Sequence, residues 1–293
     1  MASLTLKHLR YFEAVALHRH FGHAAEACAI SQPALSVQIK ELEQILKTPL
    51  FERGARQVTL TAFGAQFAPR ARDILQKVEE VQDMARASKD GMIDRLRIGI
   101  IPTIAPYLLP RVIAQLTAQS PELDIHVRET MTPRLIAELA DGRIDTAIVA
   151  LPVSEPAFTE VALFEEKFML VRPHADRGKP VPSSARLSEM KLLLLEEGHC
   201  FRDQALSFCD MQSETAREGL DASSLSTLVQ MVSAGIGITL IPEMAVAVET
   251  RSANVAVSAF APPEPRRTVG MIWRKTSPLA PKLIEIANLI KRG

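Results

Sequence analysis

The spacing of apolar residues changes near residue 90, and this change limits the folds open to the chain. Up to Lys89 most apolar residues recur every three or four positions, which is the period of a helix. Beyond that point, apolar runs of strand length alternate with stretches of helical length. Such alternation is typical of an α/β architecture with a parallel or mixed sheet. The sequence therefore predicts a mainly helical first part and an α/β second part.

Two consecutive helices in the first part predict a helix-turn-helix. A short helix fits FGHAAEACA. A longer one follows in AISQPALSVQIKELEQIL, where Ser31 suits the N-cap and Pro33 the first turn. The segment PLFERGARQVTLT then places a basic turn before a strand-like run, as in the wing of a winged helix. Serine and glutamine bind base edges, whereas lysine and arginine bind phosphates. The candidate DNA-binding residues are Ser31, Gln32, Pro33, Ser36, Gln38, Lys40, Arg53 and Arg56.

Charge alone does not separate this interpretation from an ordinary helical bundle. Residues 1–61 carry seven Lys and Arg against five Asp and Glu, and the whole chain of 293 residues has a formal net charge of zero. Any binding to nucleic acid must therefore come from a local patch.

A single long helix is predicted between Thr61 and Lys89, because no glycine follows Gly64 and no proline follows Pro69 in this stretch. Its apolar residues form one narrow seam, and the opposite face is highly charged. A helix of this kind is stabilised by a partner helix. We therefore expect a dimerisation helix, whose two-fold symmetry brings two recognition helices to one duplex.

The motifs SQPALS, PLFER and LTAFG, in this order within residues 6–64, resemble the N-terminal domain of the LysR-type transcriptional regulators. The resemblance implies a winged helix-turn-helix in residues 1–61 and a linker and dimerisation helix in residues 62–90. It also implies double-stranded promoter DNA as a partner and a homotetramer built as a dimer of dimers.

For residues 91–293 the same resemblance implies a regulatory domain like the periplasmic binding proteins, with two α/β subdomains and a ligand cleft between them. Subdomain I is expected in residues 91–165 and 268–293, and subdomain II in residues 166–267. The two chain crossings between them are expected near Leu163–Lys167 and Pro265–Val269.

The segment GHCFRDQALSFC contains two of the three cysteines of the chain, Cys200 and Cys209. A helix is predicted to begin near Cys200, where the free amides and the helix dipole lower the pKa of a thiol. Positive charge on His199 and Arg202 acts in the same direction. Asp203 can orient a donor or relay a proton, but opposes the thiolate if it lies too close. Small buried apolar cysteines are the alternative interpretation of the pair.

The spacing of the two cysteines has a geometric consequence. In a continuous helix Cys209 lies about 13 Å along the axis from Cys200 and on the opposite face. A disulfide requires Cα atoms within about 7 Å of each other. Bond formation between these thiols therefore requires the helix to unwind, which makes the segment a two-state element.

The cysteine segment, together with IPTIAPYLLP and PEPRRTVG, resembles the peroxide-sensing members of the LysR-type family. The resemblance implies that Cys200 reacts with hydrogen peroxide and that Cys209 resolves the product as a reversible disulfide, which a thiol reductant system resets. It implies that Thr103 and Thr132 position the peroxide, although the residues alone leave a helix-cap role open for Thr132. The same pocket is expected to contain His199, Arg202 and Asp203. Phe201 stands where a smaller aliphatic residue is common.

Two other functions remain open from the residues. The chain can be a LysR-type regulator that binds a small organic effector in the cleft, with incidental cysteines. It can also be a thiol peroxidase, although it has no CxxC or thioredoxin-like motif for re-reduction. Cys28 falls on the core face of the helix-turn-helix and is expected to be inert.

The remaining expectations are absences. Sequence inspection finds no catalytic triad, Walker loop or zinc framework, so we expect a regulator of antioxidant genes that is not an enzyme and has no cofactor or metal. No apolar run has the length of a bilayer span, and the N-terminus lacks a signal-peptide pattern. A cytoplasmic, nucleoid-associated protein with no membrane contact is therefore expected.

Overall fold

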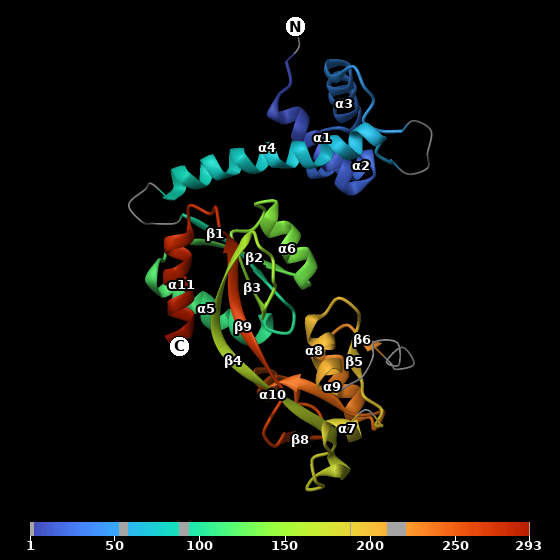
Figure 1. Ribbon diagram of the computed structural model, residues 1–293, viewed down its shortest axis with the longest axis vertical. Coiled ribbons are helices and arrows are strands. Elements are labelled where there is room, and N and C mark those ends of the chain that lie inside the picture. The colour runs from blue at the N-terminus through green and yellow to red at the C-terminus, as the bar shows by residue number, and fades with distance from the viewer. Residues whose placement is uncertain (1–2, 53–57, 88–93, 188, 210–220, 293) are drawn as a thin grey trace. The chain divides into compact units, whose positions relative to one another are not determined.

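The computed structural model describes residues 3–52, 58–87, 94–187, 189–209 and 221–292, and is shown in Figure 1. The chain forms two compact units, Met1–Ala85 and Arg86–Gly293. No helix in the described ranges combines the length and the hydropathy needed to cross a membrane. The candidate wing residues Arg53 and Arg56 lie outside the described residues.

The first unit is helical, and local capping explains where its helices begin. The helices are α1 (Leu6–His18), α2 (Phe21–Ala27), α3 (Gln32–Leu46) and α4 (Ala62–Ala87). The Thr5 hydroxyl caps α1, and the side chain of His20 caps α2. The predicted N-cap of α3 is confirmed, because the Ser31 hydroxyl accepts from the amide of Ala34 at 3.3 Å. The core includes Leu9, Phe12, Val15, Leu35 and Leu42.

The long helix α4 has two different apolar faces. Ala68, Ala71 and Leu75 are buried in the core of the first unit. Another set of large apolar side chains is exposed, namely Phe63, Ile74, Val81 and Met84. The helix starts where Thr61 donates its hydroxyl hydrogen to the carbonyl of Pro49 and accepts from the amide of Gly64. Gly64 allows this turn, because a Cβ there would collide with the carbonyl oxygen of Leu50.

The second unit is built on a seven-stranded mixed sheet in the order β2-β1-β3-β9-β4-β7, with β8 pairing to β4. The strands are β1 (Arg95–Ile100), β2 (Asp124–Glu129), β3 (Thr146–Leu151), β4 (Phe158–Pro173), β7 (Thr239–Pro242), β8 (Val255–Ala259) and β9 (Arg266–Arg274). A small parallel pair consists of β5 (Leu194–Leu195) and β6 (Asp221–Ala222). Strand β1 runs parallel to β2 and β3, whereas β9 runs antiparallel to β3 and β4.

Helices alternate with most strands of this unit, as the sequence predicts, whereas β4 follows β3 and β9 follows β8 with no helix between them. The helices are α5 (Ala105–Gln119), α6 (Thr132–Ala140), α7 (Ser184–Leu187), α8 (Cys200–Phe208), α9 (Leu225–Ser233), α10 (Glu243–Glu249) and α11 (Ala280–Arg292), with a 3-10 turn at His174–Asp176. The observed α/β architecture confirms the predicted fold class.

The second unit has two hydrophobic cores: β4 contributes to both, whereas the buried apolar residues of β9 belong to the first. The first core lies around β1, β3, α5 and α11, and the second around α8, α9 and β7. In Figure 1 the long strands β4 and β9 extend from the part of the unit that contains β1, β2 and β3 toward the part that contains α8 and α9. The expected crossings at Leu163–Lys167 and Pro265–Val269 fall within or next to these two strands, where Glu166 pairs with Arg267. The candidate site lies on this part of the sheet, where β4 pairs with β9.

Candidate functional site

Cys200 is the first residue of α8, and its surroundings come from both cores. The helix belongs to the second core, yet the half-buried Cys200 side chain packs against the first core. Gly198 leads into the helix with φ +97, and a Cβ on it would lie 2.7 Å from the sulfur of Met131. Glycine is therefore required for this left-handed, close approach of the chain. Cys209 is the C-cap of the same helix and is fully buried in the second core.

Burial dominates the protonation of both thiols. It raises the pKa of Cys200 above its ordinary value of 9.0, although the Thr132 hydroxyl and the charge of Arg267 lower it. Burial also raises the pKa of Cys209 to about 11. The prediction of a depressed pKa for Cys200 is therefore wrong in its net direction. A local sequence window does not contain the burial that outweighs the helix end and the nearby charge.

The positive charge that lowers the pKa of Cys200 comes from Arg267 on β9. This residue was not singled out from the sequence. Its Nη1 donates to the hydroxyl of Thr103 at 2.9 Å, and its Nη2 donates to the carbonyl of Thr103 at 3.0 Å. Its Nε donates to Glu166 at 2.7 Å, and the other carboxylate oxygen of Glu166 accepts from the amide of Met244 at 3.0 Å. All of these polar groups are satisfied, as buried charge requires. The available signal was the double arginine of PEPRRTVG at the start of a strand.

Thr132 and His199 each bring an unsatisfied polar atom to this region. The Thr132 hydroxyl is buried and has no hydrogen-bond partner of ordinary geometry among the described residues, yet it lies close enough to lower the pKa of Cys200. It does not cap α6, whose N-cap is Met131. The Nε2 atom of His199 is likewise buried without a partner in the described part of the chain. Burial lowers the pKa of His199, with an opposing effect of Glu196, so the imidazole favours its neutral form.

Arg202 and Asp203 do not assist the thiol. The guanidinium of Arg202, 2% exposed, donates to the carbonyl of Leu195 at 2.7 Å and to the carboxylate of Asp221 at 2.8 Å. It therefore ties α8 to the β5–β6 pair. The exposed Asp203 raises the pKa of Cys200 and so opposes thiolate formation. The predicted contribution of positive charge to the thiol falls to Arg267 instead.

A cavity of about 390 Å³ lies beside this group of residues. Thr103, Met131 and His199 line it, together with the N-terminal end of α9. At its edge the hydroxyl of Tyr107 on α5 donates to Glu249 on α10 at 2.6 Å. The cavity is therefore bounded by the turns that follow β1 and β2 and by residues of the second core, and His199, the N-cap of α8, is part of its lining.

Comparison with known proteins decides the family. Residues 6–65 match the bacterial regulatory helix-turn-helix protein of the lysR family, and residues 89–293 match the LysR substrate binding domain. The chain is 41% identical over 292 residues to the DNA-binding transcriptional dual regulator OxyR of Escherichia coli K12, covering 98% of this chain and 95% of that protein. The chain belongs to the OxyR group of the LysR family.

Further OxyR proteins agree with this assignment. A hydrogen peroxide-inducible genes activator of Haemophilus influenzae is 37% identical over 291 residues, which is 98% of this chain and 96% of that one. A full-length OxyR variant from Pseudomonas aeruginosa has a TM-score of 0.76 at 35% identity, covering 99% and 96% of the two chains. An H2O2-bound OxyR variant from Corynebacterium glutamicum has a TM-score of 0.67 at 34% identity, covering 99% and 92%.

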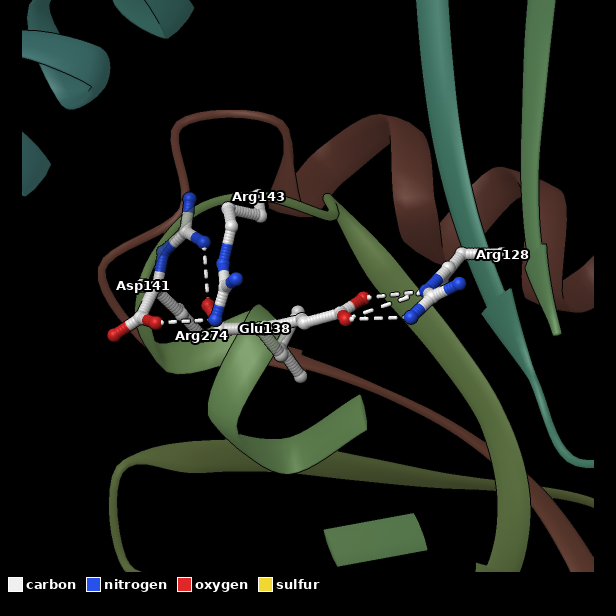
Figure 2. A network of polar contacts seen from close by, with 6 residues as sticks. Arg128, Glu138, Asp141, Arg143 and Arg274 are labelled. Carbon is white, nitrogen blue, oxygen red and sulfur yellow. Dashed lines mark hydrogen bonds and ion pairs between the residues drawn. The ribbon is translucent and has the colours of Figure 1, made fainter. Parts of the chain in front are cut away.

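Helix α6 of this OxyR-group chain is fixed at the end remote from Thr132 by the polar contacts in Figure 2. Arg128 on β2 donates to both carboxylate oxygens of the buried Glu138, at 3.1 and 3.2 Å. Arg143 binds Asp141 at 2.6 Å, and Arg274 on β9 donates to the carbonyl of Leu139 at 2.7 Å. Because the helix is held by two strands, Thr132 at its first position is held as well.

The LysR-type helix-turn-helix presents part of the predicted DNA-binding set on α3. Ser31, Gln32, Pro33 and Lys40 are exposed. Ser36 and Gln38 are half-buried, and the side-chain amide of Gln38 donates to Glu41 at 3.0 Å. The N-terminal end of α3 therefore carries polar side chains that are open to a ligand.

Proposed function

We propose that this chain is a DNA-binding transcription regulator that hydrogen peroxide switches through Cys200 and Cys209. The observation that carries the proposal is the position of two free thiols at opposite ends of α8, the first of them beside Thr132 and Arg267. The family supports it, because the similar proteins are named hydrogen peroxide-inducible genes activators and one similar structure is H2O2-bound.

The chemistry starts at Cys200. Its thiolate attacks one oxygen of the peroxide, the O–O bond breaks, and the departing hydroxide takes up a proton to become water. Cys200 is thereby oxidised by two electrons to a sulfenic acid. The hydroxyls of Thr103 and Thr132 are suited to hold the two peroxide oxygens in line with the sulfur. The charge of Arg267 stabilises both the thiolate and the departing oxygen.

The second step joins the two cysteines. The thiolate of Cys209 attacks the sulfur of the sulfenic acid, the S–O bond breaks as the disulfide forms, and the departing hydroxide takes up a proton to become water. Cys209 is buried at the far end of α8, so the helix must unwind before this attack. Unwinding also removes the burial that raises the pKa of Cys209, which makes the thiol a better nucleophile. A cellular thiol reductant resets the switch.

The first unit is suited to read DNA as an oligomer. We assign the winged helix-turn-helix to residues 1–61, the linker helix to 62–90 and the regulatory domain to 91–293, with its subdomains divided at 165/166 and 267/268. The exposed Gln32 and Lys40 on α3 are placed as candidates for base and phosphate contacts. The exposed apolar seam of α4, from Phe63 to Met84, favours pairing with a second copy. Two such dimers would form the homotetramer.

The proposed role is regulatory and not enzymatic, and it belongs in the cytoplasm. Free cysteines are typical of a compartment that keeps thiols reduced. The reaction is a single oxidation of one protein thiol pair, with activation of antioxidant genes as its output.

Peptide mapping tests this proposal. Reduced protein receives one equivalent of hydrogen peroxide, is alkylated and digested, and is analysed by mass spectrometry. We expect a Cys200–Cys209 linkage with Cys28 still free, and altered binding to a genomic DNA fragment selected with the reduced protein. Cys200→Ser should lose the redox response and keep DNA binding, while Cys28→Ser keeps both.

The contrary result has a defined meaning. If both thiols stay alkylatable and the DNA complex does not change, the cysteines are not a peroxide switch. A small organic effector in the cavity beside Thr103 would then be sought by thermal shift with a cysteine-free variant.

A further inference from the structure

The side chain that follows Cys200 is held by residues outside its own helix. The ring of Phe201 is 3% exposed. Its centroid lies 4.8 Å from that of Phe168 on β4, with the planes at 62° in an edge-to-face arrangement. The guanidinium carbon of Arg267 on β9 lies 5.5 Å from the same ring. Both geometries are favourable for an aromatic ring.

The two partners of Phe201 are fixed independently of α8. Phe168 is 2% exposed, and its amide donates to the carbonyl of Pro265 at 2.9 Å. Arg267 is held by its bonds to Thr103 and Glu166. Neither partner therefore moves with the helix, and both contacts exist only while the first turn of α8 is in place.

The opposite end of α8 is held differently. The half-buried Phe208 packs edge-to-face on Phe260, with ring centroids 5.1 Å apart. Phe260 lies just beyond β8 and packs against the second core. The first turn is thus the end of the helix at which an aromatic side chain connects the thiol segment to β4 and β9.

We propose that Phe201 is a positioning residue that sets the rate at which Cys209 resolves oxidised Cys200. This inference rests on the proposed peroxide switch. After Cys200 becomes a sulfenic acid, the Cys209 thiolate must displace its oxygen as hydroxide, which takes up a proton to become water, as the S–S bond forms and the S–O bond breaks. The two sulfurs meet only when α8 unwinds, and unwinding the first turn must withdraw the Phe201 ring from Phe168 and Arg267. The ring therefore slows resolution and prolongs the lifetime of the sulfenic acid.

The proposal separates two reaction steps. Thr103 and Glu166 hold Arg267 without help from Phe201, so the first oxidation should not depend on the ring. Only the step that requires unwinding should depend on it. A merely structural role would change stability without this division between the steps.

The experiment measures each step in Phe201→Leu and in Phe168→Leu, which removes the partner ring. Sulfenic acid formation is followed in a Cys209→Ser background with dimedone trapping. Disulfide formation is followed in the full-length chain in a single turnover with hydrogen peroxide. We expect both variants to form the disulfide roughly tenfold faster than the parent and to form the sulfenic acid at a rate within about twofold of the parental rate.

Phe158→Leu controls for general destabilisation. Phe158 is also buried and lies on the same strand β4, but in the first core, so this variant should keep the parental rate of disulfide formation.

The possible failures are distinguishable. An unchanged or slower resolution rate in both ring variants, with a parent that does form the Cys200–Cys209 bond, overturns the role of Phe201 and leaves the switch intact. Equal acceleration in Phe158→Leu overturns it too, because loss of stability would then explain the effect. A parent that forms no such bond overturns the proposed function and this inference together.

Discussion

Arg267 donates from Nη1 to the Thr103 hydroxyl across 2.9 Å, and this bond links the long strand β9 to the turn that follows β1. The same guanidinium binds Glu166 on β4 and faces the ring of Phe201 on α8. One buried cation therefore contacts both long strands, the candidate peroxide pocket and the thiol-bearing helix. Because each contact uses a different part of the guanidinium, lysine could not replace it.

Arg267→Gln should therefore affect both stability and thiol chemistry. The variant leaves the buried Glu166 carboxylate without its partner, which costs about 3–5 kcal/mol in the free energy of unfolding. It also removes a charge that lowers the pKa of Cys200, so oxidation at neutral pH should slow. Urea denaturation measures the effect on stability, and dimedone trapping measures the effect on oxidation.

Arg266→Gln is the matched control, because that exposed neighbour binds Glu165 and Glu264 at the surface. Similar losses in the two variants would contradict the assignment.

Thr132→Val should separate reactivity from stability. Valine keeps the shape of the side chain and removes a buried hydroxyl that is unsatisfied among the described residues, so the free energy of unfolding should stay the same or rise. The hydroxyl lowers the pKa of Cys200, so its loss should raise that pKa further and reduce the thiolate fraction. The alkylation rate of Cys200, measured with Cys28 and Cys209 replaced by serine, should fall.

Thr130→Val provides the comparison, since Thr130 lies two residues before Thr132 and lines the cavity, but is not among the groups that shift the pKa of Cys200. If both threonine variants react at the parental rate, Thr132 has no part in activating Cys200.

Gly198→Ala should cost more stability than Gly178→Ala. Both glycines have positive φ, +97 and +81, so alanine introduces left-handed strain of about 1–2 kcal/mol at either position. Only at Gly198 does the new Cβ meet another group, the Met131 sulfur at 2.7 Å, whereas nothing lies within 4 Å at Gly178. Thermal unfolding of both variants measures the difference. Equal losses of stability would show that the Met131 side chain moves aside without destabilising the fold. The short distance between Gly198 and Met131 would then have no role in packing.

Much of the fold was predictable because local chemistry determines it. The cap at Ser31 and the helical period of α3 need only neighbouring residues, and the alternation after residue 90 predicts the α/β unit. Two features of the site were not local. Arg267 reaches the surroundings of Cys200 only because β9 and α8 meet in the folded chain. The direction of the Cys200 pKa depends on burial by the first core, which the sequence of α8 does not contain.

The orientation of Arg202 illustrates the same limit. GHCFRDQALSFC mixes polar and apolar residues, and sequence proximity to Cys200 favoured a role for this arginine at the thiol. The helix instead turns its guanidinium toward Leu195 and Asp221, where it satisfies a buried carbonyl and an ion pair. Adjacent residues on a helix point about 100° apart, so proximity in sequence does not place two side chains in one pocket.

His199 should make stability fall at mildly acidic pH. Burial lowers its pKa below the ordinary value of 6.5 in the folded chain, whereas the unfolded chain takes up a proton near 6.5. The unfolded state therefore binds more protons below pH 6.5, and stability rises with pH across this window. The stability that neutral His199 contributes is fully present above pH 6.5 and is lost as the pH falls toward the lower pKa of the folded state.

Unfolding free energies, measured by urea denaturation across this pH window, should depend less steeply on pH in His199→Gln than in the parent. His174→Gln, at an exposed position, should keep the parental slope. A parental slope in His199→Gln would mean that another group is responsible for the acid sensitivity.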